Sequence, residues 1–373
     1  MTNFELLSQA LMRLFWDLRV GLSLPLRRML AMLTTSILDG TPAHLTALAE
    51  SLPDETKAQS GKEQRVRRFL SNAKISPARL LPVFLHLLQP LLQRLPAIIL
   101  AMDRTHWKKR RRHVNILMVS VAFQGRAIPV FWIVLDRAGN SSLAQWKRVL
   151  SPVIEELQKH AWCATIPIIL VADREFASPR LAQWLKTTYQ VESVLRIKRS
   201  AYLGDDDQTM QLCDLLAYFP RGATRFYRHV TVTKQSDLQV NVTITWGTAY
   251  AEPLMIMATG DDAAQAIHTY EQRFGIEPMF KDLKSNGFDI EGTKVTDPKR
   301  VETLLIVMTL AHILCTCEGA RQEADGEAKK NGDRAPGFAL SDSFSWGTKR
   351  SNIGFKERST LDSVSVSSAC STS

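Results

Sequence analysis

The sequence predicts an α/β protein with a helical N-terminal part and a β-rich part near its middle. Three observations support this fold class. Residues 3–92 repeat apolar side chains at intervals of three and four, the period of an α-helix. Residues 96–198 alternate short apolar runs with helical stretches in the order β-β-β-α-β-α-β. From about residue 200 to 258 the apolar residues alternate with period two, which is typical of antiparallel strands.

Changes in composition along the chain predict its domain boundaries. We expect a helical domain over 1–95, an α/β core over 96–198 that resumes over 261–318, a β-rich insertion over 199–260 and a polar tail over 319–373. The tail ends in a serine-rich stretch with little material for a core, so we expect it to be disordered.

The net charge and the cysteines indicate the kind of partner and the redox state of the protein. The 373 residues include 47 Lys and Arg against 37 Asp and Glu, a formal charge of +10 that favours a polyanionic partner such as nucleic acid. Five scattered cysteines indicate reduced thiols rather than a disulfide framework, and we interpret Cys315 and Cys317 as core residues. The longest apolar run, LLIVMTLAHILC, is too short to cross a bilayer, so we expect no membrane partner.

Two aspartates end apolar strands of the predicted sheet. Asp103 closes AIILAMD and Asp173 closes PIILVAD, so both carboxylates emerge at one edge if the strands are neighbours. Glu277, on a later helix, could close over that edge. Converging carboxylates repel one another unless a cation lies between them, and ligation by oxygen alone suits Mg²⁺ or Mn²⁺. An aspartate at a strand end is also a common turn former, so each residue alone is weak evidence.

The segment TYEQRFGIEPMFKDLKSNGFDIEG carries polar residues at helical spacing. On one continuous α-helix, Tyr270, Arg273, Glu277 and Lys284 would lie within about 60° of one another. Such a stripe faces either plain water or a highly charged partner.

The pattern Y-x2-R-x3-E-x6-K formed by these four residues resembles the signature of one group of bacterial insertion-sequence transposases with a DDE catalytic triad. AMDRTHW and LVADREF look like the stretches that carry the first and second aspartates of that group. IEPMFKDLKSNGFDIE is similar to the surroundings of its glutamate. The resemblance runs from about residue 60 to about 318 and implies a ribonuclease-H-like core, a mixed sheet flanked by helices.

The resemblance implies a DNA transposase that cuts and joins strands at the terminal inverted repeats of its own element. Asp103, Asp173 and Glu277 would hold two Mg²⁺ or Mn²⁺ ions and perform catalysis. Tyr270, Arg273 and Lys284 would grip phosphates and bases of the element end. Its partners would be double-stranded DNA of the element ends and of the target, and it would act as a homodimer in the synaptic complex. It would be a bacterial protein, located in the cytoplasm and associated with the nucleoid.

Basic and aromatic residues outside the triad are further candidates for DNA contacts. Trp246, in VTITWG, could stack on a displaced base or simply pack on the core. Lys108, Lys109, Arg110, Arg111 and Arg112 follow the first aspartate and would clamp phosphate. Arg65, Arg67 and Arg68 lie on an early basic helix that could bind the inverted repeat.

Three departures from the family pattern leave alternatives open. Pro278 could begin a new helix, which would remove Tyr270 and Arg273 from the stripe. Glu175 stands where the family commonly has glycine. The region after about 318 is unlike the C-terminal helical part of the family, which often pairs subunits. The alternatives are a nuclease of the same fold that does not join strands, and a non-catalytic DNA-binding derivative.

Overall fold

The computed structural model describes residues 3–331 apart from 54–57, 110–111, 136–138, 205–208, 234–237, 250 and 261. Residues 1–317 form one compact unit, and residues from 318 onward belong to a second. Most of the tail predicted over 319–373, from 332 on, lies outside the described residues.

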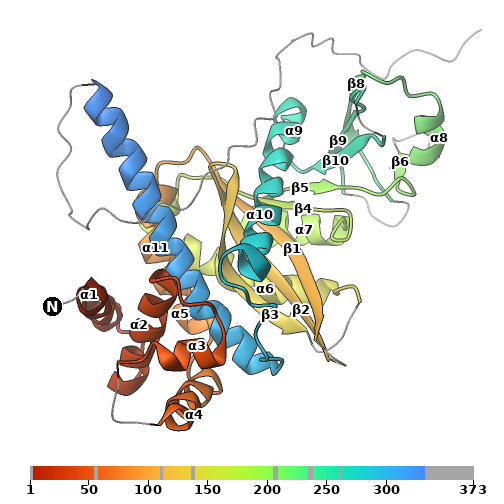
Figure 1. Ribbon diagram of the computed structural model, residues 1–373. Helices are drawn as coiled ribbons and strands as arrows, with labels where there is room; N and C mark the ends of the chain where they lie inside the picture. Colours follow the sequence, from red (N-terminus) through yellow and green to blue (C-terminus); the bar gives the residue numbers. More distant parts are fainter. Residues whose placement is uncertain are drawn as a thin grey trace, which may run out of the picture. The chain divides into compact units, whose positions relative to one another are not determined.

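The N-terminal part is helical, as the apolar period predicts. It contains α1 (Asn3–Asp17), α2 (Leu24–Leu38), α3 (Leu45–Glu50), α4 (Gln59–Leu70) and α5 (Pro77–Leu92). Ser76 caps α5 by accepting from the backbone N–H of Arg79 at 3.3 Å, and Pro77 occupies a first-turn position where no N–H is needed. Figure 1 shows these helices gathered beside the central sheet.

The predicted order β-β-β-α-β-α-β is confirmed. It consists of β1 (Ile98–Lys109), β2 (Arg112–Phe123), β3 (Arg126–Leu135), α6 (Leu143–Gln158), β4 (Ile168–Ala172), α7 (Pro179–Tyr189) and β5 (Glu192–Arg196), with a short 3₁₀ turn η1 (Ala161–Cys163) before β4. The Ser142 capping box begins α6, and Gln190 ends α7 in the left-handed conformation.

The β-rich segment contributes strands to the same sheet. It holds the small hairpin of β6 (Tyr202–Gly204) and β7 (Thr209–Gln211), then α8 (Leu212–Ala217), β8 (Thr224–Val230), β9 (Val240–Thr245) and β10 (Leu254–Ala258). Among the described residues the main sheet has eight strands in the order β3-β2-β1-β4-β5-β10-β9-β8. The β1–β4 and β4–β5 pairs are parallel and the others are antiparallel, so this mixed, helix-flanked sheet fits a ribonuclease-H-like core.

The first strand is longer than the sequence indicates, and Asp103 does not end it. Beyond Asp103, β1 continues to Lys109 because residues 104–109 pair with residues 117–112 of β2. Thr105 and Trp107 are buried, whereas His106 and Lys108 are exposed, which is the alternation of a strand with one covered face. Only the parallel pairing with β4 stops at Met102, opposite Ala172.

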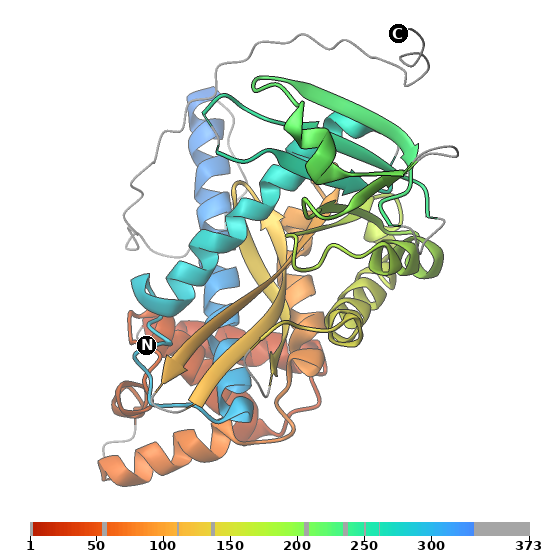
Figure 2. The same cartoon turned by 90° about the vertical axis from the view of Figure 1, so that its right-hand side faces the viewer.

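A segmented helical stretch crosses the sheet. It is built from α9 (Ala263–Glu271), the 3₁₀ turn η2 (Gln272–Gly275), α10 (Ile276–Lys281) and the π-turn η3 (Asp282–Asn286). The stretch contacts strands β1 to β4, and Figure 2 shows it (teal) passing over the long strands β1–β3. It is therefore not the continuous α-helix on which the predicted stripe was based.

The last helix, α11 (Pro298–Asn331), extends past the predicted start of the polar tail. Its final turns are rich in Glu, Ala, Lys and Arg, which are strong helix formers. Residues 298–324 are long and apolar enough to cross a membrane by length and composition, contrary to our expectation from the apolar run alone. However, 56% of the most apolar window is buried, as in the core helix of a soluble protein.

The hydrophobic core joins the helical part to the sheet. Trp132 of β3 is fully buried, stacks on Phe84 of α5 at 6.1 Å between ring centroids, and donates its indole N–H to the carbonyl of Glu302 on α11 at 3.3 Å. Among the described cysteines, Cys315 is exposed and Cys317 is only partly buried, so the prediction that both are core residues is wrong for Cys315.

Candidate active site

Parallel strand pairing places the two predicted aspartates side by side. The pairing of β1 with β4 ends with Met102 opposite Ala172. Asp103 is the next residue of β1, and Asp173 is the residue that follows β4. The backbone N–H of Arg104 donates to Asp103 Oδ1 at 2.7 Å and so orients that carboxylate. Burial raises the pKa of Asp103 to about 6, against the lowering effects of this hydrogen bond and of Arg273.

The segmented helix brings Tyr270, Arg273 and Glu277 to the same place. Gly275, between η2 and α10, lies so close to β3 that a Cβ atom there would come within 2.6 Å of the backbone of Arg126. The absence of a side chain at Gly275 thus allows the helix to lie directly on the sheet. Pro278 falls in the first turn of α10 without ending the helical path.

Arg273 joins two of the three acidic side chains. Its guanidinium donates from Nη1 to Asp103 Oδ2 at 3.1 Å and from Nη2 to Glu277 Oε1 at 3.0 Å. The Arg273 side chain is only 6% exposed, whereas that of Glu277 is 61% exposed. A buried guanidinium therefore neutralises the carboxylates of Asp103 and Glu277, and the Glu277 side chain is exposed to solvent.

The third carboxylate is held by two other donors. The hydroxyl of the fully buried Tyr270 donates to Asp173 Oδ1 at 3.2 Å, and Nη1 of Arg196, the last residue of β5, lies 3.5 Å from the same oxygen. Burial raises the pKa of Tyr270 to about 12, so this hydroxyl keeps its proton and remains a donor.

Lys284 lies further along the same segment. Its ammonium donates to the carbonyl of His106 on β1 at 3.2 Å and lies 3.5 Å from Glu291 Oε1. Tyr270 and Arg273 contact carboxylates, and Lys284 contacts backbone and a carboxylate. The DNA contacts expected for these three residues stay predictions.

The carboxylates can be tested for their fit to a divalent cation. Among the described residues, no group of three or more His, Cys, Asp or Glu side chains is placed to hold one metal ion. The Arg273 guanidinium stands between Asp103 and Glu277. Asp103 and Asp173 alone lie side by side, and their oxygen donors fit a hard divalent ion that would offset the burial of Asp103. A site for such an ion therefore fits on these two aspartates.

Trp246 lies at the same edge of the sheet as the carboxylates. Strand β9 runs parallel to β4, because both β5–β10 and β10–β9 are antiparallel pairs. Trp246 directly follows β9, which is three strand spacings, about 14 Å, from β4. The guanidinium of Arg221 lies 5.3 Å from the centre of its ring. The side chain is half-buried against the core, so it combines packing with partial exposure.

The predicted basic patches fall on two separate elements. Lys108 and Lys109 end β1 and Arg112 begins β2, so these three residues lie at one end of the β1–β2 pair. Arg110 and Arg111 lie outside the described residues. On α4, Arg65 and Arg68 line a shallow depression with Gly61 and Gln64. Arg67 on the same helix pairs with Glu63 at 3.2 Å.

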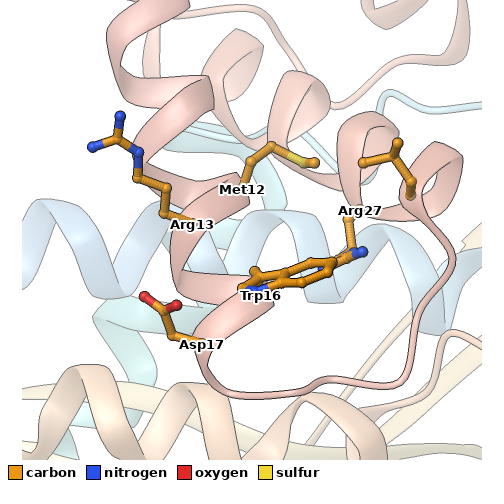
Figure 3. A pocket seen from close by; sticks show the side chains of 6 residues that line it. Met12, Arg13, Trp16, Asp17 and Arg27 are labelled. Atoms are coloured by element: carbon orange, nitrogen blue, oxygen red, sulfur yellow. The ribbon is translucent and has the colours of Figure 1, made fainter.

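A second shallow pocket lies apart from all predicted site residues. It is formed on α1 and α2 by Met12, Arg13, Trp16, Asp17, Leu24 and Arg27. Figure 3 shows the ring of Trp16 against Arg27, with Arg13 and Asp17 on the same helix. Trp16 is 67% exposed.

Sequence reasoning missed the residues that support the aspartates. Arg104 and Glu175 form an ion pair of 2.9 Å directly beside Asp103 and Asp173. Arg196 contacts Asp173 from the next strand. Two features of the sequence could have indicated Arg104 and Glu175: both lie within two residues of an aspartate, and Glu175 stands where the family commonly has glycine.

Comparison with known proteins identifies the family of the central part of the chain. The family model described as transposase DDE domain matches residues 94–314, which include Asp103, Asp173 and Glu277. No curated protein matches the chain. A crystal structure of endonuclease V from Bacillus subtilis is similar at 10% identity over 72% of this chain and 96% of that one, with a TM-score of 0.24 that is too low to support an argument. The matched domain covers more than half of the sequence, and the chain therefore belongs to the family of DDE-domain transposases.

Proposed function

We propose that this protein is a DNA transposase that binds the terminal inverted repeats of its own insertion sequence and performs metal-dependent strand cleavage and strand transfer. One observation carries the proposal: Asp103, Asp173 and Glu277, from three distant parts of the chain, are linked by Arg273 and Tyr270 at one edge of the sheet. The family match over residues 94–314 supports the same chemistry.

The carboxylates account for the chemistry of phosphoryl transfer. Asp103 and Asp173 would hold Mg²⁺ or Mn²⁺, and Glu277 would complete a two-ion site once Arg273 releases it. The ions supply charge neutralisation at the phosphate and activation of a water or 3′-hydroxyl. The protein contributes position: the pairing of β1 with β4 places the two aspartates side by side, and the Tyr270 and Arg196 contacts fix the direction of Asp173.

Basic and aromatic side chains would hold the DNA. Arg273 contacts Asp103 and Glu277, and Lys284 lies further along the same segment, against the carbonyl of His106. Both side chains could transfer to phosphate oxygens when a substrate displaces their present partners. Lys108 and Lys109 are the last two residues of β1, in the part of the strand that continues beyond Asp103. Trp246 and Arg221 would contact a base further along the same edge, and Arg65, Arg67 and Arg68 on α4 would bind the repeat.

The test is an assay of strand cleavage and joining. Purified protein is incubated with a labelled DNA end from the flanking inverted repeat and a target plasmid, with Mg²⁺ or Mn²⁺. We expect nicking, followed by joining to the plasmid. Asp103→Asn should abolish both reactions while a gel shift shows unchanged end binding, and Asp39→Asn, at an exposed aspartate after α2, should behave as wild type.

Other outcomes would identify other functions. Cleavage without joining would indicate a nuclease of this fold, and a gel shift alone would indicate a DNA-binding protein without catalysis. Cleavage that survives Asp103→Asn would mean that the carboxylates have been assigned wrongly.

A further inference from the structure

We propose that Arg104 and Glu175 form a positioning clamp that sets the spacing of the two aspartates and thereby the affinity of the site for its divalent ion. The proposal rests on the proposed function, because it concerns the metal site of the same reaction. Neither residue is a ligand in this scheme, and both act through the backbone next to Asp103 and Asp173.

The clamp is a bidentate ion pair between β1 and the segment that follows β4. Arg104 donates from Nε to Glu175 Oε1 at 3.0 Å and from Nη2 to Glu175 Oε2 at 2.9 Å. The two side chains are 14% and 22% exposed, so solvent screens the pair only in part. This fork geometry constrains direction as well as distance, which a single contact would not do.

Further hydrogen bonds fix the pair to the loop before α6. Arg104 Nη1 also donates to the carbonyl of Gly139. Glu175 Oε1 accepts from the hydroxyl of Ser141 at 3.2 Å, and the indole N–H of Trp146 donates to that hydroxyl at 2.8 Å. These several contacts of one partly buried ion pair leave little freedom for either charged side chain to change partner.

The clamp lies just beyond the last hydrogen-bonded residues of the β1–β4 pair. The last paired residues are Met102 and Ala172, so Asp103 and Asp173 stand just beyond the ladder. Arg104 follows Asp103 by one residue and Glu175 follows Asp173 by two. Their ion pair therefore joins the same two chain segments immediately past the last ladder position.

The clamp and the aspartates use opposite faces of β1. Successive side chains of a strand point to opposite sides, so Asp103 reaches Arg273 on the helical segment while Arg104 reaches Glu175 and Gly139 near α6. The backbone N–H of Arg104 donates to Asp103 Oδ1 at 2.7 Å, so a shift of Arg104 is transmitted directly to the carboxylate. The clamp can thus position the aspartates without touching a metal ion or DNA.

The test measures Mn²⁺ binding separately from catalysis. Isothermal titration calorimetry of the full chain with Mn²⁺ alone, without DNA, is compared for wild type, Glu175→Gln, Arg104→Lys and the double variant Arg104→Gln/Glu175→Gln. Loss of a residue that orients metal ligands typically weakens metal binding by about 10–100-fold, and we expect at least about a tenfold increase in the Mn²⁺ dissociation constant for Glu175→Gln. Glu156→Gln removes an ion pair of the same 2.9 Å length on α6 and should leave Mn²⁺ binding unchanged.

The double variant separates positioning from stability. Glu175→Gln leaves a partly buried guanidinium without its carboxylate, so its melting temperature should fall. The double variant leaves no unpaired charge, so the melting temperature should recover while Mn²⁺ binding stays weak. Arg104→Lys keeps the charge but loses the fork, and should weaken Mn²⁺ binding with little change in melting temperature.

Several results would overturn the clamp. Wild-type Mn²⁺ affinity in folded Glu175→Gln and Arg104→Lys would do so, as would recovery of affinity together with melting temperature in the double variant. If wild type itself neither binds Mn²⁺ nor cleaves DNA, the proposed function fails, and the clamp fails with it. If wild type cleaves DNA and the variants bind Mn²⁺ as wild type does, the clamp proposal alone is wrong and the proposed function stands.

Discussion

Arg273 donates a hydrogen bond to Asp103 over 3.1 Å across 170 positions of sequence, and this contact fixes the segmented helix on the sheet. The Arg273 side chain is only 6% exposed and that of Asp103 is 21% exposed, so removal of Arg273 would leave a largely buried carboxylate without its cation. Arg273→Ala should therefore lower the free energy of unfolding by roughly 2–4 kcal/mol in urea denaturation. Arg67→Ala, which breaks an exposed pair with Glu63, should cost less than about 1 kcal/mol. Equal losses in the two variants would contradict a special role for Arg273.

The Tyr270 hydroxyl gives a second test of how the carboxylates are held. Tyr270→Phe removes only the donor to Asp173 and keeps the buried ring. We expect the free energy of unfolding to fall by about 1–2 kcal/mol, since a hydrogen bond to a charged acceptor is lost. Tyr218→Phe, at a side chain that is 89% exposed, should leave it unchanged. Stability equal to wild type for Tyr270→Phe would show that the hydroxyl does not restrain Asp173.

Gly275 tests whether close contact between helix and sheet is needed for the site. Gly275→Ala would place a Cβ atom within 2.6 Å of Arg126 backbone, which cannot move aside as a flexible side chain could. We expect a loss of about 1–3 kcal/mol in the free energy of unfolding and slower DNA cleavage. Gly319→Ala, in α11 with nothing within 4 Å, should instead stabilise by up to about 1 kcal/mol. Losses in both variants would point to a general intolerance of alanine rather than to this contact.

The basic face of α4 can be tested through the salt dependence of DNA binding. Arg65→Ala/Arg68→Ala should weaken end binding and reduce the slope of log K against log salt by about 1–2, the number of phosphate contacts removed. Arg94→Ala removes an exposed positive charge after α5 and serves as the control. A fluorescence anisotropy titration at several salt concentrations measures the slope. An unchanged slope would exclude phosphate contacts by this face.

His312 on α11 predicts a pH dependence of stability. Its ring packs on Phe288, and burial lowers the pKa of His312 from its ordinary value of 6.5 to about 4. The unfolded chain takes up the proton as the pH falls below 6.5 and the folded protein does not. This residue should therefore remove up to roughly 1.4 kcal/mol of stability per pH unit between 6.5 and about 4, and nothing above 6.5.

The variant His312→Gln isolates this contribution. Its free energy of unfolding should fall less steeply than that of wild type between pH 6.5 and 4, in urea denaturation followed by circular dichroism. His86→Gln, at an exposed histidine on α5, should keep the wild-type profile. Parallel profiles for wild type and His312→Gln would mean that His312 is solvated in the folded protein.

Much of the catalytic core could be predicted from local sequence patterns. Apolar runs and helical periods gave the correct order from β1 to β5, because each run must be buried whatever its neighbours are. The two aspartates were recognised because each follows such a run. The extension of β1 to Lys109 was missed, since its polar residues alternate with only two buried ones, Thr105 and Trp107.

The sequence by itself determined the order of the core elements, the residues that carry acidic and basic chemistry, and the family they resemble. Only the tertiary structure decided which charges meet: Arg273 with Asp103 and Glu277, Tyr270 with Asp173, and Arg104 with Glu175. The spacing rule assumed one uniform α-helix, whereas packing on the sheet introduces a 3₁₀ turn at Gln272–Gly275 and a π-turn at Asp282–Asn286. Side-chain pairs form between segments that lie far apart in sequence, and their energies depend on burial, which exists only once the sheet and its covering helices are assembled.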